Sequence, residues 1–307
     1  MKGISMRDLI IIGAGPAGLS AAVYAKRAAI DTLVIEKSPM CGGQIMNTYE
    51  VDNYLGLPGI GGFEMAQRFR EHADRLECEF VTADVSDITK ENEYFIVKTD
   101  QGDFETKAII IAAGAIHAKL GVPGEEELAG MGVSYCATCD GAFFRNRTVA
   151  VVGGGDVAVE DAIFLARSCE KVYLIHRRNE LRAAAILAEA LNKLDNVEIL
   201  WDTVLESING EDNVESISIR NVHNDAKSSL DVAGVFIAVG LVPNSNTFRD
   251  IVPLDEKGYI IADENGITQT KGIFAAGDIR TKKLRQIITA VADGATAVTG
   301  VQQHLWG

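Results

Sequence analysis

The chain of 307 residues is long enough for two domains, each with its own hydrophobic core. Apolar residues make up 47% of it and charged residues 23%, which is the composition of a soluble globular protein. The net charge of −14 at pH 7 excludes nucleic acid and anionic membrane as expected partners, because both are bound by basic surfaces.

A strand, a glycine turn and an alanine-rich helix are predicted in the first part of the chain, RDLIIIGAGPAGLSAAVYAKR (7–27). The basic and then apolar start has features of a secretory signal, but its apolar run is broken at GAGPAG, and no apolar run is long enough to span a bilayer. With five cysteines and no export signal, we expect a reducing, cytoplasmic location.

The same pattern returns as a diverged repeat in RTVAVVGGGDVAVEDAIFLAR (147–167), and a second strand follows the helix in each copy. Glu36 follows Gly13 by 23 residues, and His176 follows Gly153 by the same 23 residues. Two β-α-β units with matched spacing predict two dinucleotide-binding domains.

A second pair of segments supports this organisation. AIIIAAGA (108–115) and VFIAVGLVP (235–243) each read as a buried strand that ends in glycine and leads into a linker. The remaining stretch is too short for a third domain and is expected to return to the first. The sequence thus predicts an α/β fold with two Rossmann-like domains, residues 1–117 with 246–307 forming the first domain and residues 118–245 an inserted second domain.

The assignment of nucleotides depends on the residue that ends the second strand of each copy. Glu36 is a carboxylate suited to free ribose hydroxyls, so the first copy is expected to take an unphosphorylated adenosine, from FAD or NAD. The second copy has His176, Arg177 and Arg178 there, with Arg182 close behind, and guanidiniums at this position indicate the 2′-phosphate of NADPH.

The stretch GIFAAGDI favours FAD in the first domain. It comes where the chain returns to that domain, and Gly277 and Asp278 within it suit a close backbone approach and a polyol hydroxyl.

The spacing of Cys136 and Cys139 has three interpretations. A zinc site would need a second pair of ligands at matching spacing, and the other cysteines are isolated; a structural disulfide is not expected in the cytosol. A redox-active dithiol therefore fits best. Asp140 follows directly and is either a proton donor and acceptor for the thiols or a turn-forming residue, and the two roles are compatible.

Taken in order, the motifs GAGPAG, GGQ, CATCDG, GGGDVAVEDA, HRRNELRA, VFIAVGLVPN, GIFAAGD and LRQIITA resemble those of low-molecular-weight, bacterial-type NADPH-dependent thioredoxin reductases over essentially the whole chain. The resemblance implies a homodimer in which NADPH reduces FAD, electrons pass to the Cys136–Cys139 disulfide, and the dithiol reduces thioredoxin. It also implies that the NADPH domain rotates between the half-reactions, about linkers near 115–122 and 241–247.

The resemblance also implies the binding residues by position. The implied FAD contacts are Gly13, Gly15, Pro16, Ala17, Glu36, Lys37, Gly43, Gln44, Asn53, Val85, Ala113, Gly114, Gly277, Asp278, Arg285, Gln286 and Ile287. The implied NADPH contacts are Gly155, Asp156, Val157, His176, Arg177, Arg178, Arg182 and Gly240. Cys136, Cys139 and Asp140 are the implied catalytic residues, with Cys139 as the thiol nearer the flavin.

Several alternatives stay open beside this reading. A reductase of another thioredoxin-like or peroxiredoxin-system protein would share the motifs, although the peroxiredoxin-linked type usually has an added N-terminal region. A flavin-dependent dithiol oxidase would be expected to lack the phosphate-binding arginines. Cys41, close to the expected flavin, is interpreted as a small filler residue rather than a third redox centre.

Overall fold

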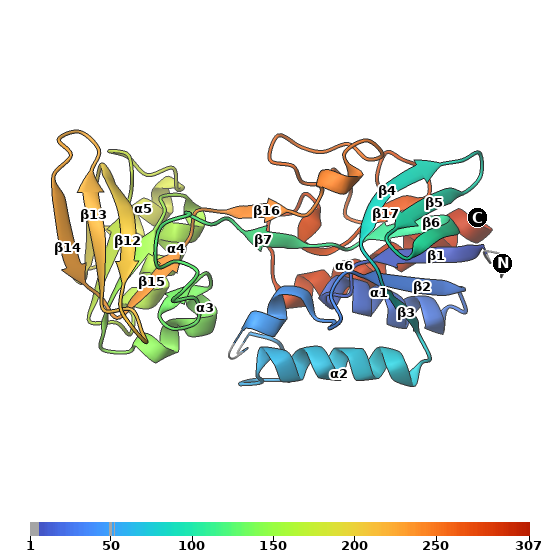
Figure 1. Cartoon of the computed structure of the whole chain (residues 1–307), viewed down its shortest axis with the longest axis horizontal. Helices are drawn as coiled ribbons and strands as arrows, with labels where there is room; N and C mark the ends of the chain where they lie inside the picture. Colours follow the sequence, from blue (N-terminus) through green and yellow to red (C-terminus); the bar gives the residue numbers. More distant parts are fainter. Residues whose placement is uncertain (1–5, 49–50, 52) are drawn as a thin grey trace. The chain divides into compact units, whose positions relative to one another are not determined.

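The computed structural model describes residues 6–48, 51 and 53–307. It divides into two compact units (Figure 1). The first consists of the chain up to Ile116 together with Val242–Gly307, and the second, His117–Leu241, is inserted between these two segments. The predicted α/β fold with two Rossmann-like domains is confirmed.

The first unit is built on one mixed sheet in the strand order β3-β2-β1-β6-β5-β4, with β17 also paired to β6. Strands β3, β2, β1, β6 and β17 pair in parallel, whereas β4, β5 and the beginning of β6 form an antiparallel meander. The strands are β1 (Arg7–Ile12), β2 (Thr32–Glu36), β3 (Glu79–Thr82), β4 (Val85–Lys90), β5 (Phe95–Thr99), β6 (Gly102–Ile111) and β17 (Ile273–Ala275).

The continuous apolar run of β1 reflects burial on both faces of this sheet. Leu9 and Ile11 belong to a core cluster shared with the helices, whereas Ile10 and Ile12 belong to the cluster on the opposite face. Parallel strands covered on both faces require such a run rather than alternation. The helical elements of this unit are α1 (Pro16–Arg27), η1 (Gly43–Asn47), α2 (Gly62–Arg75), η3 (Asn246–Phe248), η4 (Gly277–Ile279) and α6 (Ile287–Trp306).

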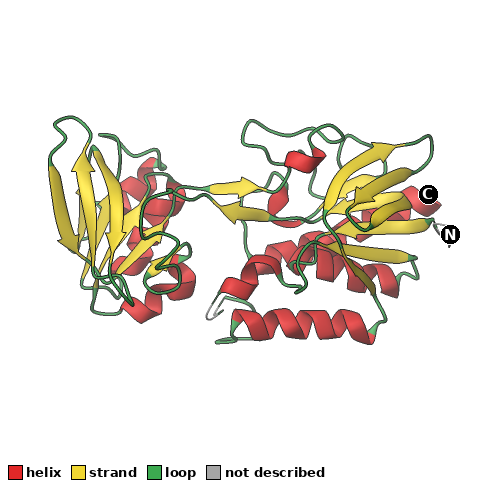
Figure 2. Ribbon diagram, in the orientation of Figure 1, coloured by secondary structure: helices red, strands yellow, loops and turns green. Residues whose placement is uncertain are grey.

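The second unit repeats this plan with a smaller parallel sheet in the order β11-β10-β9-β15-β8. A separate antiparallel sheet, β12-β13-β14, packs on one side of it (Figure 2). The strands are β8 (Val133–Ser134), β9 (Thr148–Val152), β10 (Lys171–Ile175), β11 (Val197–Leu200), β12 (Thr203–Asn209), β13 (Ser216–Asn221), β14 (Lys227–Asp231) and β15 (Gly234–Ile237).

Alternate side chains of β9 again enter two cores. Val149 and Val151 pack with the helices, whereas Ala150 and Val152 pack with residues of β12 and β13. The helical elements here are α3 (Ala137–Asp140), η2 (Gly141–Phe144), α4 (Asp156–Ala166) and α5 (Ala185–Leu191).

The two segments that connect the units, β7 (Ala115–His117) and β16 (Leu241–Pro243), pair with each other as a two-stranded ribbon. The main-chain N–H of Ala118 donates to the carbonyl of Gly240 at 2.9 Å, and the N–H of Asn244 donates to the carbonyl of Gly114 at 3.0 Å. In the described part of the chain, no helix has the length and apolar character needed to cross a membrane.

Candidate redox centre and dinucleotide sites

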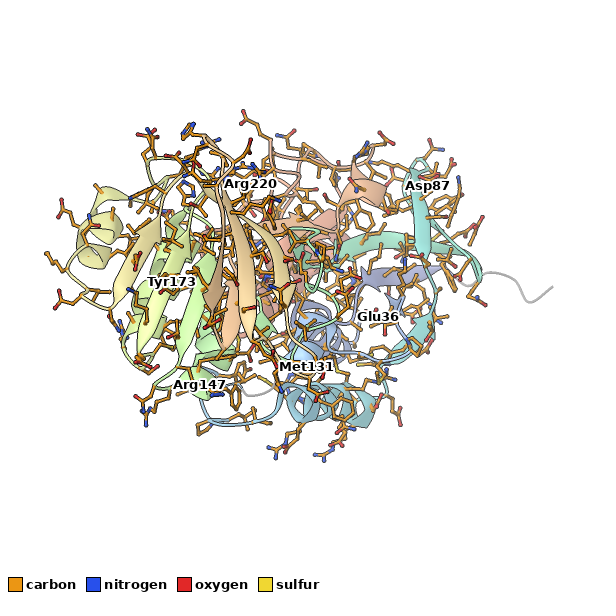
Figure 3. The ribbon with its side chains drawn as sticks, turned by 60° about the vertical axis from the view of Figure 1, so that its left-hand side comes forward. Glu36, Asp87, Met131, Arg147, Tyr173 and Arg220 are labelled. Atoms are coloured by element: carbon orange, nitrogen blue, oxygen red, sulfur yellow. A yellow bond between two sulfur atoms is a disulfide. The ribbon has the colours of Figure 1, made fainter. Side chains whose placement is uncertain are left out.

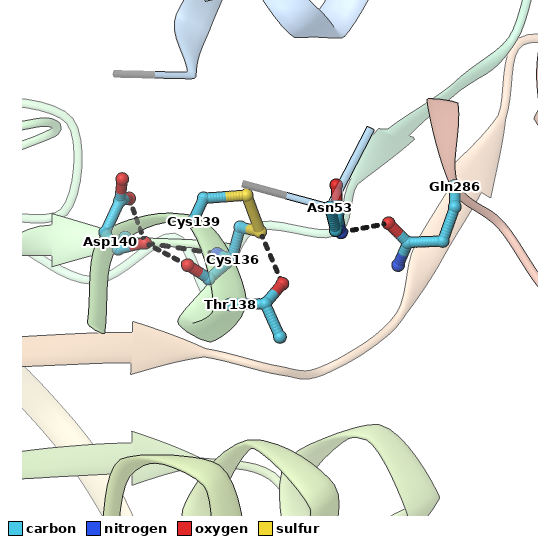
Figure 4. Close-up of a disulfide and its surroundings, with 7 residues drawn as sticks. Asn53, Cys136, Thr138, Cys139, Asp140 and Gln286 are labelled. Carbon is cyan, nitrogen blue, oxygen red and sulfur yellow. Dashed lines mark hydrogen bonds between the residues drawn. A yellow bond between two sulfur atoms is a disulfide. The ribbon is translucent and has the colours of Figure 1, made fainter. Parts of the chain in front are cut away.

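The two cysteines predicted to be redox-active lie where β8 leads into α3. Because α3 begins directly after Cys136, the chain turns tightly and the Cα atoms of Cys136 and Cys139 are 5.3 Å apart. Their sulfurs form a disulfide (Figure 4). Both cysteines are partly exposed. Exchange of such a bond with a thiol of another molecule requires access to one of its sulfurs.

Asp140 is fixed beside this disulfide by Ser134. The Ser134 hydroxyl donates to Asp140 Oδ2 at 2.5 Å and accepts the N–H of Cys136 at 3.1 Å. Burial raises the pKa of the Asp140 carboxyl, and the hydrogen bond from Ser134 opposes this rise. The site therefore holds a carboxyl that takes up a proton more readily than usual, next to a disulfide whose reduction consumes protons. Sequence reasoning missed Ser134, and its position two residues before Cys136 was the available signal.

The first glycine turn lies between β1 and α1. A Cβ atom on Gly13 would stand 2.5 Å from the carbonyl oxygen of Ala112, so only glycine allows β1 to approach the end of β6 this closely. Glu36 ends β2 (Figure 3). Its Oε2 accepts the N–H of Ala14 at 2.6 Å. The predicted ribose-binding carboxylate thus lies against the turn.

Other residues expected to contact FAD join this turn through main-chain contacts. The N–H of Gly42 donates to the carbonyl of Ala14 at 2.8 Å, which fixes the start of η1 beside the turn. Gly15 precedes α1, Pro16 and Ala17 form its first turn, and Gly43 and Gln44 begin η1.

A second group comes from the ends of β6 and β17, which pair in parallel and therefore finish at one edge of the sheet. Ala113 and Gly114 follow β6, and Gly277 and Asp278 follow β17 in η4. Asp278 is largely buried, burial raises the pKa of its carboxyl, and its Oδ1 is the buried side-chain oxygen left without a hydrogen-bond partner among the described residues.

The remaining predicted FAD contacts fall into two places. Asn53 Nδ2 donates to Gln286 Oε1 at 3.0 Å, which brings Asn53 to the residue that caps α6 just before Ile287. Arg285 Nη2 donates to the carbonyl of Arg280 at 3.3 Å. Lys37 and Val85 lie instead beyond the ends of β2 and β3, where Lys37 is exposed and pairs with Asp84 at 2.7 Å.

The second glycine turn, between β9 and α4, repeats the geometry of the first. A Cβ atom on Gly153 would lie 2.5 Å from the carbonyl oxygen of Ala238, at the end of β15. Gly155 precedes α4, whose first residues are Asp156 and Val157. The predicted contact Gly240 follows β15 and has a φ of 119°, which favours glycine.

The loop after β10 closes over this turn and presents arginines. The N–H of Arg182 donates to the carbonyl of Gly154 at 2.7 Å, and Asp156 Oδ1 accepts the N–H of Ala184 at 2.7 Å. Arg177, Arg178 and Arg182 are exposed, and within the described part of the chain none of the three is paired with a carboxylate. Unpaired guanidiniums gathered at a glycine turn suit a phosphate.

His176 differs from its arginine neighbours because it is buried. A Cβ atom on Gly154 would lie 2.1 Å from its Nδ1, so the imidazole packs directly under the turn. Burial lowers the pKa of His176, although the hydrogen bond with the carbonyl of Glu180 raises it. The ring is therefore neutral at pH 7 and shapes the turn rather than adding charge.

Cys41 is half-buried beside the first turn, and its sulfur accepts from Arg70 Nη1 at 3.0 Å. Burial raises the pKa of this thiol, and Arg70 opposes the rise. Among the described residues no group of three or more histidine, cysteine or acidic side chains is arranged to hold a metal ion.

Residues 7–294 match the model of the pyridine nucleotide-disulphide oxidoreductase family. The chain is 46% identical over 299 residues to the thioredoxin reductase of Listeria innocua serovar 6a, a match that spans 97% of this chain and 93% of that protein. It is 44% identical over 299 residues to the thioredoxin reductase of Bacillus subtilis strain 168, over 97% and 94% of the two chains. The chain belongs to the thioredoxin reductase family.

A solved structure supports membership of this family. The crystal structure of thioredoxin reductase from Streptococcus pyogenes MGAS5005 superposes with a TM-score of 0.88 at 43% identity, over 99% of each chain. The protein is thus a flavoprotein disulfide oxidoreductase of the FAD-containing, NADPH-dependent kind. The first unit fits FAD, since Asp278 Oδ1 is buried without a partner and the glycine turn lies against Glu36.

Proposed function

We propose that this enzyme reduces oxidised thioredoxin with NADPH, using FAD in the first unit and the Cys136–Cys139 pair in the second. The observation that carries the proposal is the partly exposed disulfide with a carboxyl of raised pKa beside it, in the unit that also has unpaired arginines at its glycine turn. Bound FAD would supply a carrier that accepts a hydride and delivers two electrons to a disulfide.

The cysteine pair would exchange directly with the substrate. One thiolate attacks a sulfur of the thioredoxin disulfide and forms a mixed disulfide, and the second thiol then displaces reduced thioredoxin and restores the Cys136–Cys139 bond. Two electrons and two protons leave the dithiol in this cycle. Asp140, held by Ser134, would take up or release one of these protons at its carboxyl.

The polar residues of the two turns would select the nucleotides. Glu36 would accept from ribose hydroxyls of FAD, and Asp278 would accept from a hydroxyl of its polyol chain. Arg177, Arg178 and Arg182 would bind the 2′-phosphate that distinguishes NADPH from NADH.

We also infer from the family that the enzyme is a cytoplasmic homodimer whose second unit turns between the half-reactions. The β7–β16 ribbon supports the rotation of the second unit, because the two connections between the units pair with each other and a few residues there can absorb the change in backbone angles. Analytical ultracentrifugation would test the dimer, which predicts a sedimenting species of twice the chain mass of 33.0 kDa.

Steady-state and anaerobic assays test the function. With purified thioredoxin, NADPH oxidation should proceed and NADH should support it poorly. The Cys139→Ser variant should lose turnover completely because its remaining thiol cannot close a disulfide, while its flavin absorbance still bleaches on adding NADPH. Cys78→Ser is the matched control and should keep full turnover, since Cys78 is a partly buried residue that packs against the core of the other unit.

The possible results separate the parts of the proposal. Flavin bleaching without turnover would refute thioredoxin as the substrate and direct the search to another disulfide protein. A purified protein that bleaches with NADH as readily as with NADPH would refute the role given to the arginines.

A further inference from the structure

A buried group of charges underlies the turn that carries Asp278, and no part of the proposed function uses it. Asp293, on α6, accepts from Arg280 Nε and Nη2 at 2.9 Å each and from Lys282 Nζ at 2.8 Å. Its Oδ2 also accepts the N–H of Gly277 at 2.9 Å. The side chains of Arg280, Lys282 and Asp293 are only 4%, 7% and 10% exposed.

Asp278 is the other acid in this region, and unlike Asp293 it forms no ion pair among the described residues. Its Oδ1 has no hydrogen-bond partner among the described residues. Burial raises the pKa of its carboxyl, the charges of Lys282 and Arg285 oppose this rise, and the charge of Asp293 adds to it. Arg285 is held in another way, because it donates to the carbonyl of Asp278 and lies 4.0 Å from the ring centre of Tyr259. The cations around Asp278 are thus occupied elsewhere.

This distribution needs an explanation, because buried cations and a nearby buried carboxylate ordinarily pair. A single acid, Asp293, satisfies two cations and one main-chain N–H at once. If Asp293 were neutral, Lys282 would lose its counter-ion and Arg280 would keep only the exposed Glu264 at 3.9 Å, and Asp278 would be the remaining carboxylate close to Lys282.

We propose that Asp293 is a positioning residue for the flavin site: it holds Arg280, Lys282 and the N–H of Gly277, and so keeps the Asp278 carboxylate free for a ligand hydroxyl. The inference rests on the proposed binding of FAD in the first unit. Asp293 would touch no ligand itself and would act only through Asp278. Its role is distinct from that of a salt bridge that merely stabilises the fold.

The test measures the binding of FAD to the full-length apoprotein, with quenching of the FAD fluorescence as the readout. Asp293→Asn should raise the FAD dissociation constant about 10- to 100-fold, the effect of losing a hydrogen bond to a charged acceptor. Glu264→Gln is the matched control, because Glu264 also approaches Arg280, at 3.9 Å, but is 97% exposed. It should leave the dissociation constant within about twofold.

A second variant separates positioning from general destabilisation. Asp293→Asn combined with Lys282→Met restores the net charge of the group and removes the cation with the larger electrostatic influence on Asp278. The double variant should recover most of the lost FAD affinity, whereas a purely structural role of Asp293 predicts no recovery. Circular dichroism and thermal unfolding would establish that each apoprotein is folded.

The outcomes distinguish the inference from the function beneath it. Wild-type affinity in the Asp293→Asn variant, or an unrecovered loss in the double variant, would overturn the inference alone. A wild-type protein that binds no FAD would overturn the proposed function instead.

Discussion

The two units share one β-α-β plan and differ in how they use its second strand. In both, the first glycine of the turn would clash with a strand-end carbonyl if it carried a Cβ atom, at 2.5 Å in each case. In the first unit the strand ends in Glu36, whose carboxylate is already bound to main-chain N–H groups of Ala14 and Ser38. In the second, the equivalent position is a buried histidine followed by exposed, unpaired arginines.

Under the proposed function, the backbone would set where a pyrophosphate lies, and a few side chains after the second strand would decide which nucleotide is bound. The backbone of the glycine turn and of the helix start is alike in the two units and carries no information on the 2′-position. The charge of the residues at the end of the second strand does carry that information. Exchanging that charge should therefore change nucleotide preference without disturbing the fold.

The largest expected effect comes from replacing the arginines of the second unit, which should change the preference for NADPH over NADH. Replacing both Arg177 and Arg178 by alanine should raise the KM for NADPH by about 10²-fold or more, because two charge-assisted hydrogen bonds to the phosphate are lost. The KM for NADH should stay nearly constant, so selectivity collapses. Arg147→Ala is the control, since Arg147 precedes β9 at the opposite end of the strand from the turn (Figure 3). An equal rise for both nucleotides would contradict the assignment.

Glu36→Gln should have a smaller effect, on the binding of FAD by the first unit. Glutamine keeps one acceptor oxygen but loses the charge, so we expect the FAD dissociation constant of the apoprotein to rise by about tenfold. The KM for NADPH should not change. Glu79→Gln, an exposed acid at the start of β3, should leave both quantities unaltered. If Glu36→Gln bound FAD as well as wild type does, the carboxylate would only support the turn.

The shared plan explains why much of the fold could be predicted from the sequence. The glycine turns, the continuous apolar strands and the spacing from Gly13 to Glu36 are local patterns that a β-α-β unit imposes on its own residues. The antiparallel sheet β12-β13-β14 was not predicted, because its short strands, half-buried on one face, leave a weaker pattern.

The features of the candidate sites divide into local patterns and tertiary contacts in the same way. The cysteine pair carries its own spacing, and the structure shows it as a disulfide. The hydrogen bond of Ser134 to Asp140, the burial of His176 and the ion pairs of Asp293 depend on tertiary packing, and no local spacing announces them. Asp293 in particular lies on a helix that meets η4 only in the folded chain.

A further difference between the copies lies inside their helices and has the smallest expected effect on activity. Asp161 of α4 stands where the first copy has the fully buried Ala21, eight residues after the first glycine of each turn. Burial, with a contribution from neighbouring Glu160, raises the pKa of Asp161 to about 7. The folded protein therefore keeps this proton to a higher pH than the unfolded chain, whose carboxyl titrates near its ordinary value of about 4.

The sign of the resulting pH dependence follows from linkage. Stability due to the protonated Asp161 is complete at low pH and is lost as the pH rises through about 7, because the folded state must then bury a charge. Asp161→Ala makes α4 resemble α1 at this position and removes the loss of folding stability at high pH. The variant should unfold at a higher temperature than wild type at pH 8, with a smaller difference at pH 5, while turnover is unchanged. Glu170→Gln, an exposed acid after α4, should show no pH-dependent difference. A variant equally stabilised at both pH values would place the effect in packing rather than in ionisation.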